Sequence, residues 1–406
     1  MTSSLSRIGS ANTYDNAVRN ISMRQSALSN LQENLTSGKR VVRASDDPTS
    51  AANAERALNR ISRIATDQRA LEAQRNAIAM AESTLGDVTN SLQRFRELVV
   101  SAGNGVHSNA ERKSIAIELQ GLRDQIFASA NQKDTNGLPL FSALGSALAP
   151  FVGPQATPPD YTFNGLPGQA ASSDVAIPFT LDGDAAFMHQ PARDGVYNTS
   201  VSTIPSGRTL TTDGVTVTNA SAVTGASYLI AITNVDTTTT PGTTVVSYDV
   251  TTTPPGSTAA QVAPGYPSAQ SASIAVAGMA GLALTFNGTP AVGDTLTVAP
   301  SPSIFSVLDN AIKDIKEAPN NNGATQAVGQ ALHNIDIGMS RISAVRGQAG
   351  DLLNRADRIT GNQESRNIQL EADRSRAEDL DMVKGISDFN NQQTGYSAAL
   401  QTYAKV

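Results

Sequence analysis

Both ends of this 406-residue chain repeat their apolar residues every seven positions, and this repeat constrains the fold more than any other feature of the sequence. Near the N-terminus the repeat runs through Tyr14, Ile21, Leu28 and Leu35, with Leu31 at an intervening position. A seven-residue apolar repeat gives a helix one narrow stripe that packs against a partner helix. The N-terminal segment is therefore predicted to be a coiled-coil helix.

The C-terminal segment carries the same repeat, with spacings that alternate between four and three. Its positions are Met382, Ile386, Phe389, Gln393, Tyr396, Leu400 and Tyr403. Gln393 is polar, and either it fixes the register of the helices or it lies in solvent. Two helices with narrow stripes and no third layer are marginal inside one molecule. We therefore predict that these seven residues and the five N-terminal ones form an assembly interface with other subunits, the alternative being a coiled coil within the chain.

Longer helices with the same repeat are predicted inside these ends. Every seventh residue over Ile64–Val99 is apolar, which indicates one long helix that begins at an N-cap, Asp47. Gly38 is expected to end the preceding helix. Ser108 and Glu111 form a candidate capping box for a third helix.

The middle of the chain has a different composition. Sixteen of the 19 prolines lie between Pro150 and Pro302, and residues 145–303 hold nine Asp and two Arg but no Glu and no Lys. Turn dipeptides recur there beside β-prone runs, which is typical of strands joined by tight turns. In particular, apolar residues alternate on both sides of Asn287-Gly288, and this pattern predicts a β-hairpin.

Heptad helices resume over Val328–Ile359, and the register slips before Met382, which predicts a bend. The fold class is therefore α+β and multidomain, with a long helical bundle or coiled coil built from both chain ends and an all-β domain inserted in the middle. The predicted domains are a terminal coiled-coil assembly region (1–45 plus 365–406), a helical bundle rod domain (46–144 plus 304–364) and an outer β domain (145–303).

Catalytic and metal chemistry find little support in the sequence. The chain has no Cys, which excludes disulfides, thiolate metal sites and cysteine nucleophiles. Its three His residues are isolated, and Asp46, Asp47 and Arg43 fit loop and capping roles better than a metal or acid–base cluster. We expect no catalytic, cofactor-binding or metal site, no enzymatic activity and no nucleic-acid or membrane partner. The first ten residues lack the apolar stretch of a cleaved signal peptide.

Particular motifs at the two ends resemble the bacterial flagellin superfamily. They are LQENLTSGKR at 31–40 and ASDDP at 44–48, then AEDL at 377–380, NNQQ at 390–393 and AALQ at 398–401. The resemblance implies a layered protein whose paired terminal helices assemble and whose variable β domain faces outward. It also implies export through the flagellar type III apparatus, so that the protein is secreted.

Short motifs nearer the insert are similar to the hook–filament junction branch of that superfamily. They are NG at 136–137, LFS at 140–142, AFM at 186–188, GTPA at 288–291, GD at 293–294 and TV at 297–298. This resemblance implies a structural adapter at the distal end of the hook, connecting hook-associated protein 1 to the flagellin filament. The implied partners are a ring of identical subunits, hook-associated protein 1, flagellin and a flagellar export chaperone. The alternatives are a filament-forming flagellin and an unrelated adhesin on a coiled-coil stalk.

Overall fold

The computed structural model describes residues 10–146, 148–157 and 159–404. Residues 1–9, for which no cleaved signal peptide is expected, lie outside the described residues. The chain forms two compact units, one from residues up to 70 together with residues from 358 onward, the other from residues 71–357. The six long helices are α1 (Ser10–Ser37), α2 (Pro48–Ala102), α3 (Asn109–Ala130), α6 (Ile304–Glu317), α7 (Asn321–Glu378) and α8 (Met382–Tyr403).

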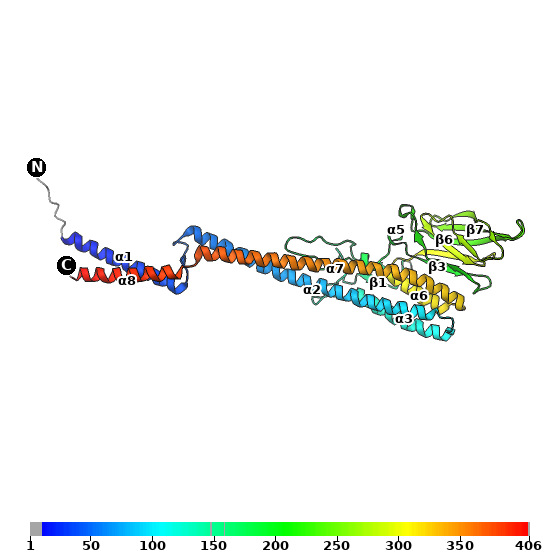
Figure 1. The fold of residues 1–406 in the computed structure, drawn as a ribbon, viewed down its shortest axis with the longest axis horizontal. Helices are drawn as coiled ribbons and strands as arrows, with labels where there is room; N and C mark the ends of the chain where they lie inside the picture. Colours follow the sequence, from blue (N-terminus) through cyan, green and yellow to red (C-terminus); the bar gives the residue numbers. More distant parts are fainter. Residues whose placement is uncertain (1–9, 147, 158, 405–406) are drawn as a thin grey trace, which may run out of the picture. The chain divides into compact units, whose positions relative to one another are not determined.

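The first unit contains α1 and α8, which run side by side, together with the first part of α2 and the last part of α7 (Figure 1). Gly38 adopts a left-handed φ of 69° directly after α1, so the predicted helix end is confirmed. The chain breaks between α7 and α8, where Leu380 N–H donates to Gly38 O at 2.9 Å. The predicted bend is therefore a complete helix break, and Asp381 caps α8 by accepting from Val383 and Lys384 N–H.

In the second unit, α2 and α7 pack as antiparallel neighbours. Arg346 of α7 pairs with Glu82 at 2.6 Å, while Asp336, earlier in α7, pairs with Arg96, later in α2, at 2.9 Å. The predicted heptad residues form the core between the helices: each of Ile78, Leu85, Leu92, Val99, Ile335 and Ile342 is fully buried. The long helix predicted from the repeat is thus confirmed.

Helix α3 begins at the predicted capping box and packs against α6. Ser108 accepts from Glu111 N–H, and the Glu111 carboxylate accepts from Ser108 N–H at 2.7 Å. Seven aromatic rings cluster beside these helices, with Phe305 of α6 at their centre. The remaining rings belong to Phe127, Phe141, Phe151, Tyr161, Phe163 and Phe187.

The middle block forms antiparallel sheets in the second unit. The largest has the strand order β3-β13-β6-β7-β8, with β9 also paired to β7, and a three-stranded sheet has the order β10-β12-β4. The two smaller sheets pair β1 with β2 and β5 with β11. The strands are β1 (Phe151–Val152), β2 (Thr162–Phe163), β3 (Tyr197–Ser202), β4 (Leu210–Thr212), β5 (Thr216–Val217), β6 (Ser227–Asp236), β7 (Thr243–Thr253), β8 (Ser257–Val262), β9 (Tyr266–Pro267), β10 (Ala272–Ala275), β11 (Leu282–Ala283), β12 (Thr285–Gly288) and β13 (Thr295–Pro300).

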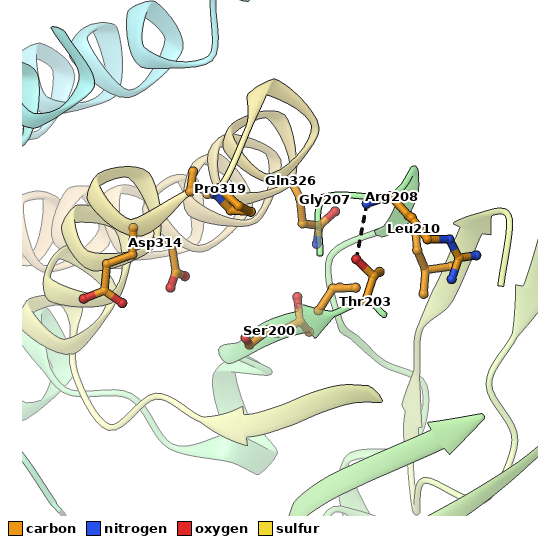
Figure 2. A pocket seen from close by; sticks show the side chains of 14 residues that line it. Ser200, Thr203, Gly207, Arg208, Leu210, Asp314, Pro319 and Gln326 are labelled. Carbon is orange, nitrogen blue, oxygen red and sulfur yellow. Dashed lines mark hydrogen bonds between the residues drawn. The ribbon is translucent and has the colours of Figure 1, made fainter. Parts of the chain in front are cut away.

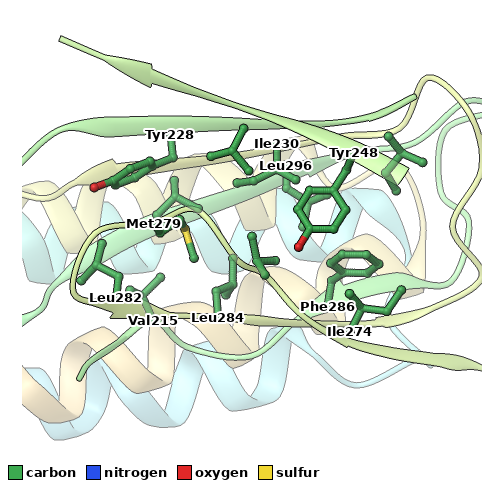
Figure 3. Packing of buried hydrophobic residues seen from close by; sticks show 14 of the residues in the cluster. Val215, Tyr228, Ile230, Tyr248, Ile274, Met279, Leu282, Leu284, Phe286 and Leu296 are labelled. Atoms are coloured by element: carbon green, nitrogen blue, oxygen red, sulfur yellow. The ribbon is translucent and has the colours of Figure 1, made fainter. Parts of the chain in front are cut away.

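The core of this insert lies between the two larger sheets. Tyr228, Ile230 and Tyr248 of the large sheet face Ile274 and Phe286 of the three-stranded sheet (Figure 3). All five side chains are at most 3% exposed, so burial of apolar surface holds the sheets together. The predicted architecture, helices from both chain ends with a β domain inserted between them, is confirmed.

The predicted β-hairpin around Asn287-Gly288 is wrong. β12 pairs with β10 and β4, whereas β13 pairs with β3 and β6 in the other sheet. The apolar residues on each side of the dipeptide alternate because every second side chain is buried in the core of the insert. Strands in two facing sheets bury alternate side chains in this way, just as the two strands of a hairpin do. Two other turn dipeptides, 182–183 and 194–195, start the short helix α4 (Gly183–Phe187) and end the short helix α5 (Pro191–Asp194).

Candidate assembly interface

The predicted N-terminal stripe lies along the side of α1 that meets α8. Ile21, Leu28, Leu31 and Leu35 are half-buried, and Tyr14 is 53% exposed. The two helices approach closely at their inner end, where a Cβ added to Gly385 would lie 3.2 Å from Leu35 Cδ2.

The predicted C-terminal stripe divides between two faces of α8. Phe389, Tyr396 and Tyr403 are half-buried on the face toward α1, which we call the α1–α8 seam. The other four predicted residues form an exposed outer α8 stripe: Met382 (45%), Ile386 (50%), Gln393 and Leu400 (41%). The two terminal helices therefore pair with each other inside the chain, through one face of each. The outer stripe remains without a partner in the described chain.

Sequence reasoning missed three residues of the seam. Gly385, Gln392 and Ala399 are less exposed than the residues of the outer α8 stripe. Together with Phe389, Tyr396 and Tyr403 they form a repeat whose spacings alternate between four and three. Each of the three lies one residue before a position of the predicted stripe. They are small or polar, so an apolar repeat does not include them. The polar residue of the seam is therefore Gln392, whose buried Oε1 has no hydrogen-bond partner among the described residues, and Gln393 does not set the register of this pair.

The acidic loop between α1 and α2 is a capping structure. Asp47 Oδ1 accepts from Ser50 N–H at 3.1 Å, and hydrogen bonds from Ser50 hold the pKa of Asp47 well below its usual range. Asp46 Oδ2 accepts from Arg43 N–H at 2.8 Å, and the Arg43 guanidinium pairs with Glu33 at 2.7 Å. Each carboxylate is thus occupied by the backbone and side chains that close the loop.

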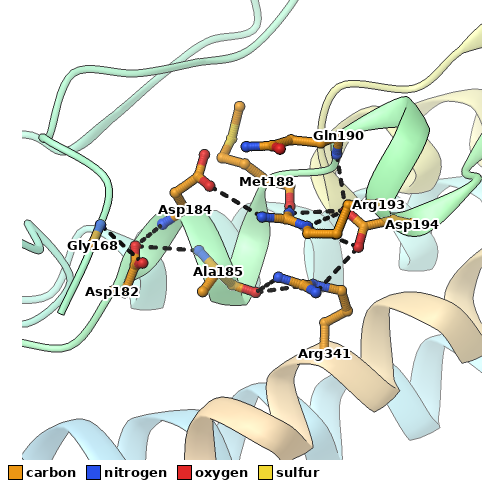
Figure 4. A network of polar contacts seen from close by, with 9 residues as sticks. All are labelled: Gly168, Asp182, Asp184, Ala185, Met188, Gln190, Arg193, Asp194 and Arg341. Atoms are coloured by element: carbon orange, nitrogen blue, oxygen red, sulfur yellow. Dashed lines mark hydrogen bonds and ion pairs between the residues drawn. The ribbon is translucent and has the colours of Figure 1, made fainter. Parts of the chain in front are cut away.

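The second unit holds a buried ionic network where α5 contacts α7 (Figure 4). The Asp194 side chain is 2% exposed and pairs with Arg193 at 2.8 Å and with Arg341 at 3.1 Å. Arg341 also donates to Ala185 O at 2.8 Å. The arginines satisfy the carboxylate and fix this end of the insert against α7.

His189 lies beside this network, and neither of its ring nitrogens forms a hydrogen bond with a residue that the structure describes. Burial lowers the pKa of His189 to about 4, so the ring is neutral near pH 7. His107 and His333 lie elsewhere, near Glu111 and Val215 respectively. Within the described ranges, no three His, Asp or Glu residues are grouped so as to hold a metal ion.

A polar cavity of about 220 Å³ lies between the insert and helices α6 and α7 (Figure 2). Arg208 and Thr203 line it from the insert, and Asp314 and Gln326 line it from the helices. Burial raises the pKa of Asp314 to about 6. Gln326 Oε1 accepts from Thr212 N–H at 2.8 Å, so the helix side chain satisfies the backbone of an insert strand. The cavity thus lies between the insert and the helices, and polar contacts such as the one from Thr212 to Gln326 hold the insert beside the helices.

None of the described helices combines the length and the apolar character needed to cross a membrane. The family model of the bacterial flagellin N-terminal helical region matches residues 8–145. The chain is 36% identical over 148 residues to flagellar hook-associated protein 3 of Salmonella typhimurium strain LT2, which covers 36% of this chain and 46% of that relative. It is 37% identical over 129 residues to the flagellin of Salmonella derby, covering 30% of this chain and 24% of that one.

The match in sequence therefore spans less than half the length of either curated relative. The similarity in structure extends further. The crystal structure of the flagellar junction protein FlgL from Legionella pneumophila is similar with a TM-score of 0.57 at 26% identity, over 75% of this chain and 98% of that chain.

Proposed function

We propose that this chain, whose residues 8–145 match the flagellin N-terminal helical region, is a member of the bacterial flagellin family and a structural adapter at the hook–filament junction of the flagellum. In this role it connects hook-associated protein 1 to the flagellin filament and performs no enzymatic reaction. Similarity to hook-associated protein 3 and to the junction protein FlgL supports this role.

The observation that carries the proposal is the uncovered apolar surface of the α1–α8 pair. Val18 (43% exposed) and Met23 (61%) are further exposed apolar side chains on α1. Several exposed apolar side chains on a pair of helices are typical of a further protein contact. We propose that the outer α8 stripe packs against the terminal helices of neighbouring subunits, while the α1–α8 seam stays within each subunit.

The remaining partners follow from the same role. Copies of this chain form a ring that meets hook-associated protein 1 on one side and flagellin on the other. The chain reaches this extracellular site by type III export with a chaperone that holds its terminal helices. We retain the three-part division at residues 45/46, 144/145, 303/304 and 364/365 as a proposal, with the terminal part as the assembly region.

A filament-forming flagellin is the second candidate, because the matched N-terminal region also occurs in flagellins. The two roles differ in the contacts that the assembled chain accepts. An adapter layer stops growing until a different subunit binds, whereas a flagellin adds copies of itself without limit.

Purified chain added to isolated hooks carrying hook-associated protein 1 tests the adapter role. Electron microscopy should show one short layer, and filaments should grow only after flagellin is added. Long filaments made of this chain alone would contradict the adapter role and favour flagellin. A strain that lacks the chain and still builds normal filaments would contradict it as well.

A further inference from the structure

In the first unit, the packed faces of α2 and α7 provide a reference for placing their charged residues. On α2 the positions toward α7 include the buried Ala57 and the half-buried Ile61 and Ile64. On α7 they include the buried Gln363 and the half-buried Asn367 and Leu370. Because each residue rotates an α-helix by about 100°, residues just before and just after these positions lie on opposite flanks.

Three arginines form a basic stripe on one flank of α2. Arg56, Arg60 and Arg63 each precede a position packed toward α7, and all three are exposed. Arg56 donates at 3.4 Å to the neutral Asn53, and no hydrogen bond or ion pair joins Arg60 or Arg63 to another described residue. The basic stripe therefore has no carboxylate partner in the described part of the chain.

An acidic stripe with the same spacing occupies one flank of α7. Glu364, Ile368 and Glu371 each follow a packed position by one residue. Both glutamates are exposed without an ion pair to any described residue, and Ile368 between them is 69% exposed. An exposed isoleucine between two unpaired carboxylates is a surface suited to the long apolar stems of arginines as well as to their charges.

The two stripes lie on opposite faces of the α2–α7 pair. Arg75 and Asp357 pair at 3.2 Å, and each follows a buried residue, Gln74 or Ala356, by one position. In these antiparallel helices, the positions that follow the packed residues therefore share one face, which is the face of the acidic stripe. The positions that precede them share the other.

A groove confirms where the basic stripe lies. Arg56 and Arg60 line a groove of about 500 Å³ together with Asp373 and Arg376 of α7. Asp373 directly precedes the half-buried Arg374 on α7, as Arg56 and Arg60 directly precede packed positions on α2. The groove therefore lies on the face of the helix pair that holds the residues preceding the packed positions. The only carboxylate among these groove residues, Asp373, already pairs with Arg376, which leaves the groove basic.

We propose that the basic stripe of one copy binds the acidic stripe of a neighbouring copy of this chain. This deepens the proposed function, on which it rests, by assigning the lateral contact within the adapter ring to six residues. Each stripe spans eight residues, and its first and last charged residues lie about 10 Å apart along the helix, so the guanidinium and carboxylate groups have matching spacing. Because the stripes face opposite ways, each copy offers a different surface to each neighbour, and the contact repeats head to tail as a ring requires.

Cysteine cross-linking in assembled flagella tests this contact, and a chain without native Cys makes it clean. The double variant Arg60→Cys, Ile368→Cys replaces wild-type protein in cells, and isolated flagella are oxidised. We expect a ladder of disulfide-linked chains on a non-reducing gel. The single variants Arg60→Cys and Ile368→Cys are the matched controls and should give no ladder.

Charge reversal in the same two-cysteine background then tests whether complementarity drives the contact. Arg56→Glu with Arg63→Glu, or Glu364→Lys with Glu371→Lys, should each lower the cross-linked yield about tenfold, because like charges then face each other. Combining all four changes reverses both stripes and should restore the yield to within about twofold.

The outcomes separate this proposal from the function on which it rests. Variant chain that is present in flagella but forms no ladder overturns the stripe contact and leaves the adapter role intact. A ladder whose yield ignores the charge reversals also overturns it, because contact would then not depend on these charges. Absence of the wild-type chain from flagella overturns both.

Discussion

Tyr403 donates a hydrogen bond from its hydroxyl to the hydroxyl of Tyr14 at 2.7 Å, and the two ring centroids lie 5.5 Å apart, although 389 positions separate the residues in the chain. This contact closes the outer end of the α1–α8 seam. Both tyrosines were predicted to be assembly residues, but here they meet within one molecule. The two chain ends therefore form a paired unit that can present a single outer surface to other subunits.

Matched substitutions on the two faces of α8 should separate folding from assembly. Leu400→Asp changes an exposed residue of the outer α8 stripe, so the free chain should keep its helix content and thermal transition while incorporation into flagella fails. Phe389→Asp places a charge in the α1–α8 seam and should reduce helix content in the free chain. Circular dichroism and immunoblots of isolated flagella measure the two effects. Loss of helix in the Leu400 variant would show that its side chain packs within the chain.

The α1–α8 pair should also be the least protected helical part of the free chain. Its seam residues are only half-buried, whereas α2 and α7 in the second unit enclose side chains such as Ile78 and Ile335 that are fully buried. Local opening is easiest where little apolar surface is buried. We expect amide hydrogens of α1 and α8 to exchange at least about a hundredfold faster than those of the buried parts of α2 and α7. Equal protection at low protein concentration would contradict this expectation.

The sequence predicted the helices well because their apolar repeat reports burial directly, as at Leu85 and Leu92. It placed the α8 seam less well, since glycine and alanine at positions 385 and 399 carry no apolar signal and only the approach of α1 reveals them. Strand pairing was not predictable from local alternation. Phe286 and Leu296 alternate correctly with their neighbours, yet they lie in different sheets whose pairing depends on distant strands.

The buried His189 should make the second unit sensitive to acid. Its pKa of about 4 in the folded chain lies below its ordinary value, so the unfolded chain binds more protons between pH 6.5 and 4. Stability should therefore fall as pH decreases through this range, by roughly 2–3 kcal/mol from this group. Charged groups around it are Asp194, Arg193 and Arg341, the two arginines opposing protonation.

Replacing this ring tests that account. His189→Leu should flatten the acid dependence of the unfolding free energy and cost little at pH 7, because neither ring nitrogen has a hydrogen-bond partner to lose. His107→Gln is the control and should keep the acid dependence of the wild type. An unchanged slope in the His189 variant, measured by urea unfolding at pH 4 to 7, would refute the assignment.

Asp314 should act in the opposite direction. Burial raises its pKa to about 6, so the folded chain binds more protons than the unfolded chain between about pH 4 and 6, and this group lowers stability as pH rises. Asp314→Asn should stabilise the protein at pH 7 by roughly 1–3 kcal/mol and change little at pH 3.5. Asp336→Asn, at an exposed ion pair with Arg96, is the control and should change stability by less than about 1 kcal/mol.

The place where the insert leaves the helices predicts which shortened chain will fold. Joining the chain from Gly145 to Phe305 deletes Phe151, Tyr161 and Phe187, whose rings contact Phe305, and also Phe163, so it removes four of the seven rings of the aromatic cluster. Met188 and Ser303, by contrast, already pair as neighbours in an isolated β-bridge. A two-glycine link between these two residues should keep a cooperative, helix-dominated transition, whereas the larger deletion should lower the midpoint substantially. Gln330 and Asn334 of α7 lose their insert partner Tyr197 O in both chains, so a difference between the chains reports the contribution of residues 146–188, which include most of the aromatic cluster. Equal melting of the two chains would show that residues 146–188, with their aromatic rings, add little to the helical core.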